Sequence, residues 1–243
     1  MNTIDKSERE TQNRIIELFR KKDGLGYTYL GYWNDREHNS NIETDLAAVY
    51  LTKAGYRKEQ IDRALHLLRT EAGNHARSLY ENNKAVYSLL RYGAKVKTDA
   101  GKNTEDVYFI NWNDPEKNDF AIAEEVALNG DHERRPGIVS CGNGVARAGA
   151  DGRGLEVTES IAVGGLELKN SRVSIGEGIR QNLSNQRPEF NEWFFSTVQF
   201  VFAGNDSEGL QYGTIGTQEK YFLKWKEDEQ ENEGYKLDMY LVK

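Results

Sequence analysis

The sequence predicts an α/β (α+β) domain: a mixed β-sheet flanked by helices, with a helical N-terminal part. Three observations support this class. Apolar residues recur every three or four positions before residue 94, as they do on one face of a helix. From Ala94 onward the period shortens to that of strands, and a helical period returns once after Ser174. Helices on the faces of a sheet give one layered domain.

Composition and charge are those of a globular protein. Of the 243 residues, 37% are hydrophobic and 29% are charged, which suffices for one domain with a sizeable core. The single cysteine, Cys141, excludes an internal disulfide framework and a cysteine-based zinc site. The net charge of −7 argues against a broad basic surface for nucleic acid but permits a local DNA groove. Without a long apolar run or a signal peptide, we expect a cytoplasmic protein that does not enter a membrane.

Four helices are predicted in the N-terminal part, which we place at residues 1–93. Capping-box pairs, Ser7 with Glu10 and Ser40 with Glu43, precede the first two. The fourth ends at Gly93, a plausible left-handed stop. The apolar faces comprise Ile15, Ile16, Leu18 and Phe19; Leu46, Val49 and Tyr50; Ile61, Ala64, Leu65 and Leu68; and Leu79, Tyr80, Val86, Leu89 and Leu90.

The second part, residues 94–243, is predicted to hold the sheet core and the C-terminal strands. Ser174 and Glu177 open its one predicted helix, and we interpret the glycine-rich stretches between residues 204 and 216 as turns. Strands are expected within 94–99, 106–112, 119–128, 137–144, 161–169, 196–205 and 220–226.

Residues 137–144 and 161–169 are predicted to pair as a hairpin. If residues 145–160 were removed, the two strands would meet at Asn143-Gly144, a strong hairpin-turn signal. The 16 residues between them are rich in glycine and alanine and show no strand alternation. We therefore interpret them as an insertion at the tip of the hairpin, where extra chain is well tolerated.

The second strand of this hairpin carries the strongest chemical signal. Glu167 and Lys169 project to the same side because side chains alternate along a strand. An acidic residue near the start of the first strand would complete a pair of carboxylates able to bind Mg²⁺, while the lysine orients or deprotonates the attacking water. Taken alone, Glu-x-Lys is a common pattern and is also typical of a solvated strand end.

Seven segments around this pattern stand together in one order: residues 8–19, 29–43, 83–97, 111–126, 133–139, 166–186 and 200–228. They closely resemble the N-terminal part of the restriction (R) subunit of type I restriction–modification enzymes, from about Asp5 to Lys243. The resemblance implies a restriction-endonuclease-like PD-(D/E)xK domain that cleaves double-stranded DNA with Mg²⁺. It also implies partners, the methyltransferase and specificity subunits. ATP would serve only motor domains outside this chain, which has no phosphate-binding loop motif.

The resemblance assigns roles to individual residues. Glu167 corresponds to the metal-binding acid, Lys169 to the catalytic lysine, and Gln181 to the glutamine of an accessory motif. Some members have a tyrosine where this chain has Asn185. Glu43 matches either the metal-binding helical acid of many such nucleases or simply the third residue of a capping box.

One position departs from the family pattern. After Arg135-Pro136 the family places an aspartate that binds the metal, and this chain has Gly137. Asp151 or Asp131 could replace the lost ligand. Two interpretations stay open: an active endonuclease domain, or an inactive, truncated R subunit that retains only DNA or partner binding.

Four arginines are predicted to contact DNA phosphates near the presumed cleft. They are Arg134, Arg135, Arg172 and Arg180. Solvated surface positions explain them equally well.

Overall fold

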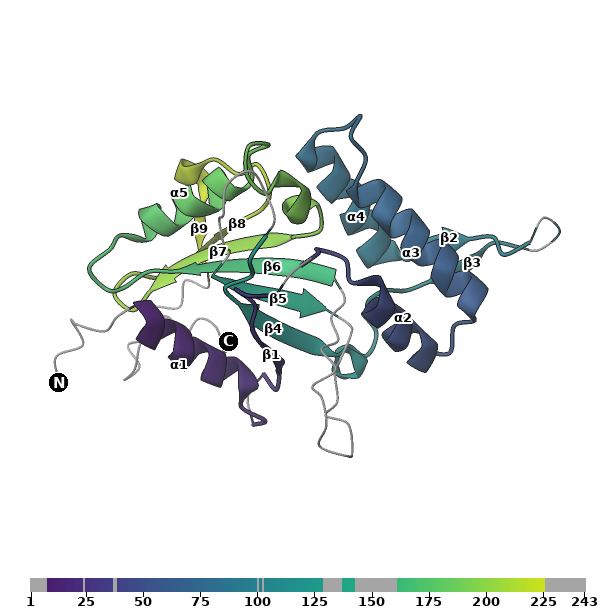
Figure 1. The fold of residues 1–243 in the computed structure, drawn as a ribbon, viewed down its shortest axis with the longest axis horizontal. Helices are drawn as coiled ribbons and strands as arrows, with labels where there is room; N and C mark the ends of the chain where they lie inside the picture. The colour runs from purple at the N-terminus through teal and green to yellow at the C-terminus, as the bar shows by residue number, and fades with distance from the viewer. Residues whose placement is uncertain are drawn as a thin grey trace.

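The computed structural model describes residues 8–23, 25–36, 39–99, 101, 103–128, 137–142 and 161–225. Its helices are α1 (Glu8–Arg20), α2 (Thr44–Lys53), α3 (Lys58–Ala72), α4 (Leu79–Tyr92) and α5 (Ile175–Asn185). Its strands are β1 (Thr28–Tyr32), β2 (Ala94–Val96), β3 (Glu105–Val107), β4 (Phe120–Glu124), β5 (Ile138–Gly142), β6 (Ile161–Leu168), β7 (Phe200–Asn205), β8 (Gly209–Gly213) and β9 (Leu223–Lys224). Figure 1 shows their arrangement. Within these ranges, no helix has the length and apolar character needed to span a bilayer.

A seven-stranded mixed sheet forms the body of the domain, which confirms the predicted α/β class. The strand order is β1-β4-β5-β6-β7-β8-β9, and β2 and β3 form a separate two-stranded sheet. β1 runs parallel to β4 and β6 parallel to β7, whereas the other neighbours are antiparallel. β5 and β6 pair as the predicted hairpin, with Ile138 opposite Leu166 and Gly142 opposite Ile161. The predicted turn and the insertion at 145–160 lie outside the described residues.

The two faces of the sheet are covered by different helices. α1 packs against one face, where Ile15 and Ile16 meet Leu166 and Leu168. α5 packs against β6 and β7 on the other, where Ile175 and Ile179 share one buried cluster with Ala203. Because side chains alternate along β6, Glu167 points away from the α1 face that Leu166 and Leu168 occupy. This alternation brings Glu167 to the side on which α5 lies.

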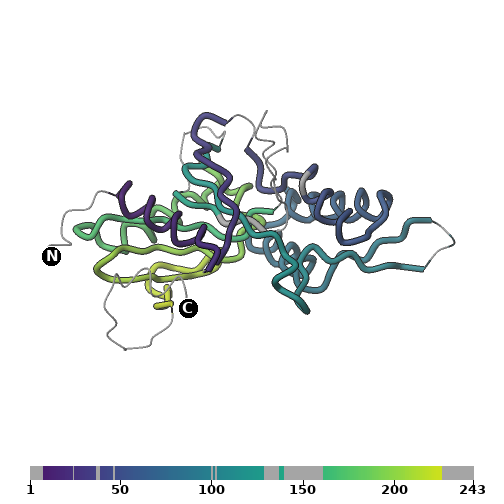
Figure 2. The backbone as a smooth tube through the Cα atoms, turned by 90° about the horizontal axis from the view of Figure 1, so that it is seen from below, coloured from purple at the N-terminus to yellow at the C-terminus, as the bar shows by residue number. Residues whose placement is uncertain are grey.

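A second core lies beyond the start of β6 and is built by α2, α3 and α4 with the β2–β3 hairpin (Figures 1 and 2). Ile42, just before α2, pairs with Ile161 at the first position of β6 and joins this core to the sheet. Each of the two cores contains residues from both sides of residue 93, where a boundary between two parts of the domain was expected. β1 belongs to the seven-stranded sheet and α1 packs on it, whereas β2 and β3 pack with α3.

Several predicted element boundaries were wrong. Residues 28–32 form β1 inside a region predicted to be helical, and residues 209–213 form β8 where turns were predicted. β1 gives a weak pattern because it has five residues and is interrupted by Gly31, at a φ of 106°. The strand expected at 106–112 spans only Glu105–Val107. α2 begins after Glu43 rather than after Ser40, whose backbone N–H donates to the Glu43 carboxylate at 3.0 Å.

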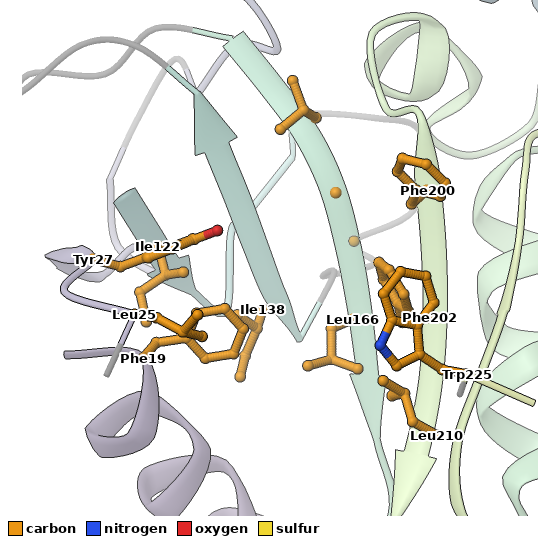
Figure 3. Close-up of a pocket in the computed structure, with 13 residues that line it drawn as sticks. Phe19, Leu25, Tyr27, Ile122, Ile138, Leu166, Phe200, Phe202, Leu210 and Trp225 are labelled. Atoms are coloured by element: carbon orange, nitrogen blue, oxygen red, sulfur yellow. The ribbon is translucent and has the colours of Figure 1, made fainter. Parts of the chain in front are cut away.

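A cavity of about 230 Å³ lies on the α1 face of the sheet (Figure 3). Phe19 of α1, Leu166 of β6 and Trp225 line it together with other aromatic and aliphatic side chains. None of the residues around it is a carboxylate or a cation. A divalent cation binds hard oxygen ligands, and this lining offers it no carboxylate.

Candidate active site

Three neighbouring strands place Glu125, Gly137 and Glu167 in one row at the end of the sheet. Glu124 is paired with Ile138, and Ile138 with Leu166. Because β5 is antiparallel to its neighbours, the residue after Glu124, the residue before Ile138 and the residue after Leu166 continue the row just beyond these pairs. The backbone N–H of Glu125 donates to the carbonyl oxygen of Gly137 at 2.8 Å, which holds the first two members together.

Glu167 is buried, with 3% of its surface exposed. Its Oε1 atom has no hydrogen-bond partner within the described structure. Burial raises its pKa from 4.5 to about 8; Lys169 and a hydrogen bond from the Gly137 backbone lower it, and Glu8 and Glu125 raise it. A carboxyl group with this pKa is largely protonated at neutral pH unless a cation approaches it.

The lysine and the glutamine singled out in the sequence are direct neighbours. Lys169 Nζ donates to Gln181 Oε1 at 2.8 Å and lies 3.5 Å from Glu8 Oε1. Only 12% of the Lys169 side chain is exposed. The ammonium group is therefore held in one place, on the same side of the sheet as the carboxyl group of Glu167.

α5 brings Gln181 to this site because it packs closely on β6 and β7. Its N-terminus is capped by Ser174, whose hydroxyl accepts a hydrogen bond from the Gly176 N–H at 3.2 Å. Gly178 permits the close approach. A Cβ atom there would lie 3.2 Å from the Cβ of Ala203 and 3.6 Å from that of Glu167.

The backbone of Gly137 aims at Glu167. A Cβ atom added to Gly137 would lie 3.6 Å from Oε2 of Glu167 and 3.1 Å from the carbonyl oxygen of Leu166. A side chain at position 137 would thus enter the space in front of the Glu167 carboxyl group. An aspartate would fit after a shift of a few tenths of an ångström, and glycine leaves that space without a side-chain oxygen.

Glu8, Gln12 and Glu125 also belong to this site, although the sequence did not single them out for it. Gln12 Nε2 donates to Glu125 Oε1 at 3.0 Å and to the carbonyl oxygen of Gly137 at 3.2 Å. Glu8 and Gln12 are one helical turn apart, which is a usable signal that both face the same way. Nothing in the sequence pattern predicts the left-handed backbone of Glu125, whose φ is 49°.

The structure does not bring Glu43 to this cluster. Its carboxylate accepts from the Ser40 N–H and lies 3.5 Å from a nitrogen of Arg36. Its neighbour Ile42 pairs with Ile161, at the opposite end of β6 from Glu167. Six residues of strand separate those two positions, roughly 20 Å.

The predicted DNA-contacting arginines fall into two groups. Arg180 forms ion pairs with Glu177 and Glu219, each at 2.6 Å, so its charge is already balanced. Arg172, between β6 and α5, is exposed. Arg134 and Arg135, like the possible replacement ligands Asp131 and Asp151, lie outside the described residues.

The donor atoms suit a hard cation with few protein ligands. The described ranges contain no group of three or more Asp, Glu, His or Cys residues placed to hold a metal ion. Mg²⁺ is commonly held by only one or two carboxylates, with waters and substrate phosphates completing its shell. Glu167, with an unpartnered oxygen beside the space at Gly137, fits the first of these carboxylates.

Comparison with known proteins gives one family. A family described as "Type I restriction enzyme R protein N terminus" matches residues 5–220. A search among curated proteins gave no match. The matched region covers most of the chain and contains Glu167, Lys169, Gln181 and all strands of the sheet except β9. The chain therefore belongs to the family formed by the N-terminal region of type I restriction enzyme R proteins.

Proposed function

We propose that this chain is an endonuclease domain that hydrolyses phosphodiester bonds of double-stranded DNA in an Mg²⁺-dependent reaction. One observation carries the proposal: Lys169, held by Gln181, shares the end of the sheet with the buried carboxyl group of Glu167, whose Oε1 atom has no partner among the described residues. This combination of a metal-binding acid and a fixed ammonium group suits attack by water on a phosphodiester.

Each residue has a distinct role in this proposal. Glu167 provides an oxygen ligand, and Mg²⁺, when bound, polarises the phosphate and acidifies water. Gln181 Oε1 accepts a hydrogen bond from one N–H of the Lys169 ammonium group, and Glu8 Oε1 lies 3.5 Å from the same nitrogen. The ammonium group has three donors, so it can still orient the attacking water or contact a phosphate oxygen. The low exposure of Glu167 strengthens every electrostatic interaction within the site.

The wider setting follows from the family. Type I R proteins act in restriction–modification, so DNA and the restriction complex are the partners expected in general. We propose that the methyltransferase and specificity subunits are the specific partners and that the chain acts in the cytoplasm. ATP would be required only by motor domains outside this chain.

Gly137 favours a second candidate function. Without a side-chain oxygen at this position, the site lacks the carboxylate that the family places opposite Glu167. In that case the chain would be an inactive subunit that retains DNA or partner binding. Loss of a metal ligand would weaken Mg²⁺ binding and lower the rate by orders of magnitude.

A plasmid-nicking assay with Mg²⁺ or Mn²⁺ separates the two candidates. We expect the native chain to nick supercoiled DNA and Glu167→Ala to abolish the activity. Gly137→Asp, made with residues 145–160 removed, should be faster by roughly tenfold or more. Activity confined to the repaired variant would support the inactive candidate. If all three proteins are folded and none nicks DNA, the endonuclease proposal for the isolated chain fails.

A further inference from the structure

We propose that Glu125 supplies the second carboxylate of the divalent-cation site in this chain, reaching across the space that Gly137 leaves open. The chemistry of the inference rests on the proposed endonuclease function, but the site can be tested by metal binding alone. Glu125 would replace an oxygen ligand that the neighbouring strand no longer provides.

The register of the sheet gives the first argument. Glu125, Gly137 and Glu167 each adjoin one of the paired residues Glu124, Ile138 and Leu166 on three adjacent strands, on the side toward the same end of the sheet. Two strand spacings, about 10 Å, separate the outer backbones. Two glutamate side chains that lean inward can cover this distance with a cation between their carboxylates. Gly137, between them, has no side chain to block the approach.

Contacts around Glu125 give the second argument. Gln12 donates through one amide nitrogen both to Glu125 Oε1 and to the carbonyl oxygen of Gly137. This shared donor fixes the Glu125 carboxylate beside residue 137. Within the described residues, the other oxygen, Oε2, accepts no hydrogen bond. Glu125 is also the only non-glycine residue of the described ranges with a positive φ, at 49°. Glycine would adopt this backbone conformation with less strain. A glutamate held there despite the strain indicates that its side chain has a role at this position.

An independent feature points to a ligand at this place. Glu167 is 3% exposed, and its Oε1 atom has no partner among the described residues. Buried polar atoms are nearly always paired, and an unpaired carboxylate oxygen is costly. Its Oε2 atom lies 3.6 Å from the position of a Cβ on Gly137. A cation in front of Gly137 would therefore serve Glu167 and Glu125 together.

The other nearby carboxylates are engaged. Glu8 is about half exposed and lies 3.5 Å from Lys169 Nζ, which already balances its charge. Glu124 accepts hydrogen bonds from Arg9 and from the Tyr29 hydroxyl. Glu125 is thus the acidic neighbour of Gly137 that has neither a cation nor a tyrosine as a described partner.

Mn²⁺ binding to the whole chain without DNA tests the proposal. Affinity would be measured by calorimetry and by the electron paramagnetic resonance signal of free Mn²⁺ at alkaline pH, where Glu167 ionises. We expect Glu125→Gln and Glu167→Gln each to weaken Mn²⁺ binding by at least about tenfold. Loss of a residue that only hydrogen-bonds to a metal ligand already has an effect of about this size, so loss of a ligand should have at least the same effect. Glu59→Gln, at an exposed position in the first turn of α3 and outside the site, is the matched control and should leave the affinity unchanged. Unchanged affinity in Glu125→Gln, a loss in Glu59→Gln equal to that in Glu125→Gln, or no binding by the native chain would overturn the proposal.

A rescue variant guards against misfolding. Adding Gly137→Asp to Glu125→Gln should restore Mn²⁺ affinity, because the new carboxylate enters the same space in front of Glu167. A folded double variant that stays as weak as Glu125→Gln would contradict a shared position. The outcomes also separate this inference from the proposed function. Tight Mn²⁺ binding by a native chain that does not nick DNA would contradict the endonuclease proposal and support the cation site. Nicking that is undiminished in Glu125→Gln would support the endonuclease proposal and contradict the role of Glu125 in the site.

Discussion

Glu124 and Glu167 are both buried glutamates of the same sheet, with 2% and 3% of their surfaces exposed, yet their surroundings are opposite. The Glu124 carboxylate accepts hydrogen bonds from both terminal nitrogens of Arg9 and from the Tyr29 hydroxyl. Glu167 leaves Oε1 without a partner in the described structure, and its pKa is raised to about 8, chiefly by burial.

The difference separates a carboxylate whose oxygens are engaged by neighbouring side chains from one that keeps an oxygen open to a ligand. A buried charge surrounded by donors stabilises the fold and has little left to offer a ligand. A buried carboxyl group that keeps one oxygen without a donor and has a raised pKa is poised to bind a cation or exchange a proton. Burial alone would have ranked the two residues equally, and the partners distinguish them.

The largest expected effect is the pH dependence of stability caused by Glu167. Its pKa is 4.5 in the unfolded chain and about 8 in the folded one, so the folded state binds an extra proton between these values. The stabilisation is fully present below pH 4.5 and is lost as the pH rises to about 8. The total is on the order of 5 kcal/mol. Urea unfolding of the native chain and of Glu167→Gln across this range would measure it.

The difference in unfolding free energy between the native chain and Glu167→Gln at each pH cancels the contributions of the other titrating groups. Glu167→Gln should be the more stable protein near pH 8 and close to the native chain near pH 4.5. Mg²⁺ should recover part of the lost stability of the native chain at the higher pH and leave Glu167→Gln unchanged. Parallel pH profiles for the two proteins would show that Glu167 is not protonated by burial.

Replacement of Glu124 should lower the stability of the fold, whereas Glu167→Gln should raise it near pH 8. Glu124→Ala removes the acceptor of Arg9 and Tyr29 and is expected to destabilise the fold by about 2 kcal/mol at neutral pH. Half of the Arg9 side chain is exposed, so it can turn to water and moderate the loss. Thermal unfolding would measure the change, with Glu124→Gln as the conservative control. If Glu124→Ala were as stable as the native chain, the distinction between the two glutamates would fail.

Packing of α5 behind Glu167 gives a smaller effect. In Gly178→Ala, the new methyl group would lie 3.2 Å from the Cβ of Ala203 and 3.6 Å from that of Glu167. We expect a destabilisation of about 1 kcal/mol, because the crowding offsets the helix-forming advantage of alanine. A denaturant titration would measure it, and loss of Mn²⁺ affinity would accompany a displaced Glu167. Greater stability in Gly178→Ala would show that α5 has room to move outward.

Much of the fold could be predicted from the sequence because long apolar periods specify it. α3, α4 and α5 were predicted from residues such as Ile61, Leu68 and Ile179, which recur at helical spacing and are buried as expected. β1 and β8 were missed because short strands rich in glycine and tyrosine carry almost no alternation. Their positions depend on neighbouring strands far away in sequence, and no local pattern records that pairing.

The site was predicted where its residues lie on one element or one motif. Glu167 and Lys169 share a strand end, and Gln181 was predicted to join them from the family motif; the structure places Gln181 2.8 Å from Lys169. Glu125 could not be found in this way. Its relevance depends on the register of three strands and on a left-handed backbone, both of which are properties of the assembled sheet.

The smallest expected effect concerns Lys169, whose charge is the largest influence that lowers the pKa of Glu167. In Lys169→Met the apolar stem is kept and the charge is removed, so the pKa of Glu167 should rise further. Stability at neutral pH should change by less than about 1 kcal/mol, because Glu167 is already mostly protonated there. Carbon-13 NMR of labelled glutamate carboxyl groups would follow the titration, with Lys58→Met on exposed α3 as the control. An unchanged pKa of Glu167 in Lys169→Met would show that the charge of Lys169 does not act on Glu167. The hydrogen bond from Lys169 to Gln181 would then position the ammonium group for the substrate alone.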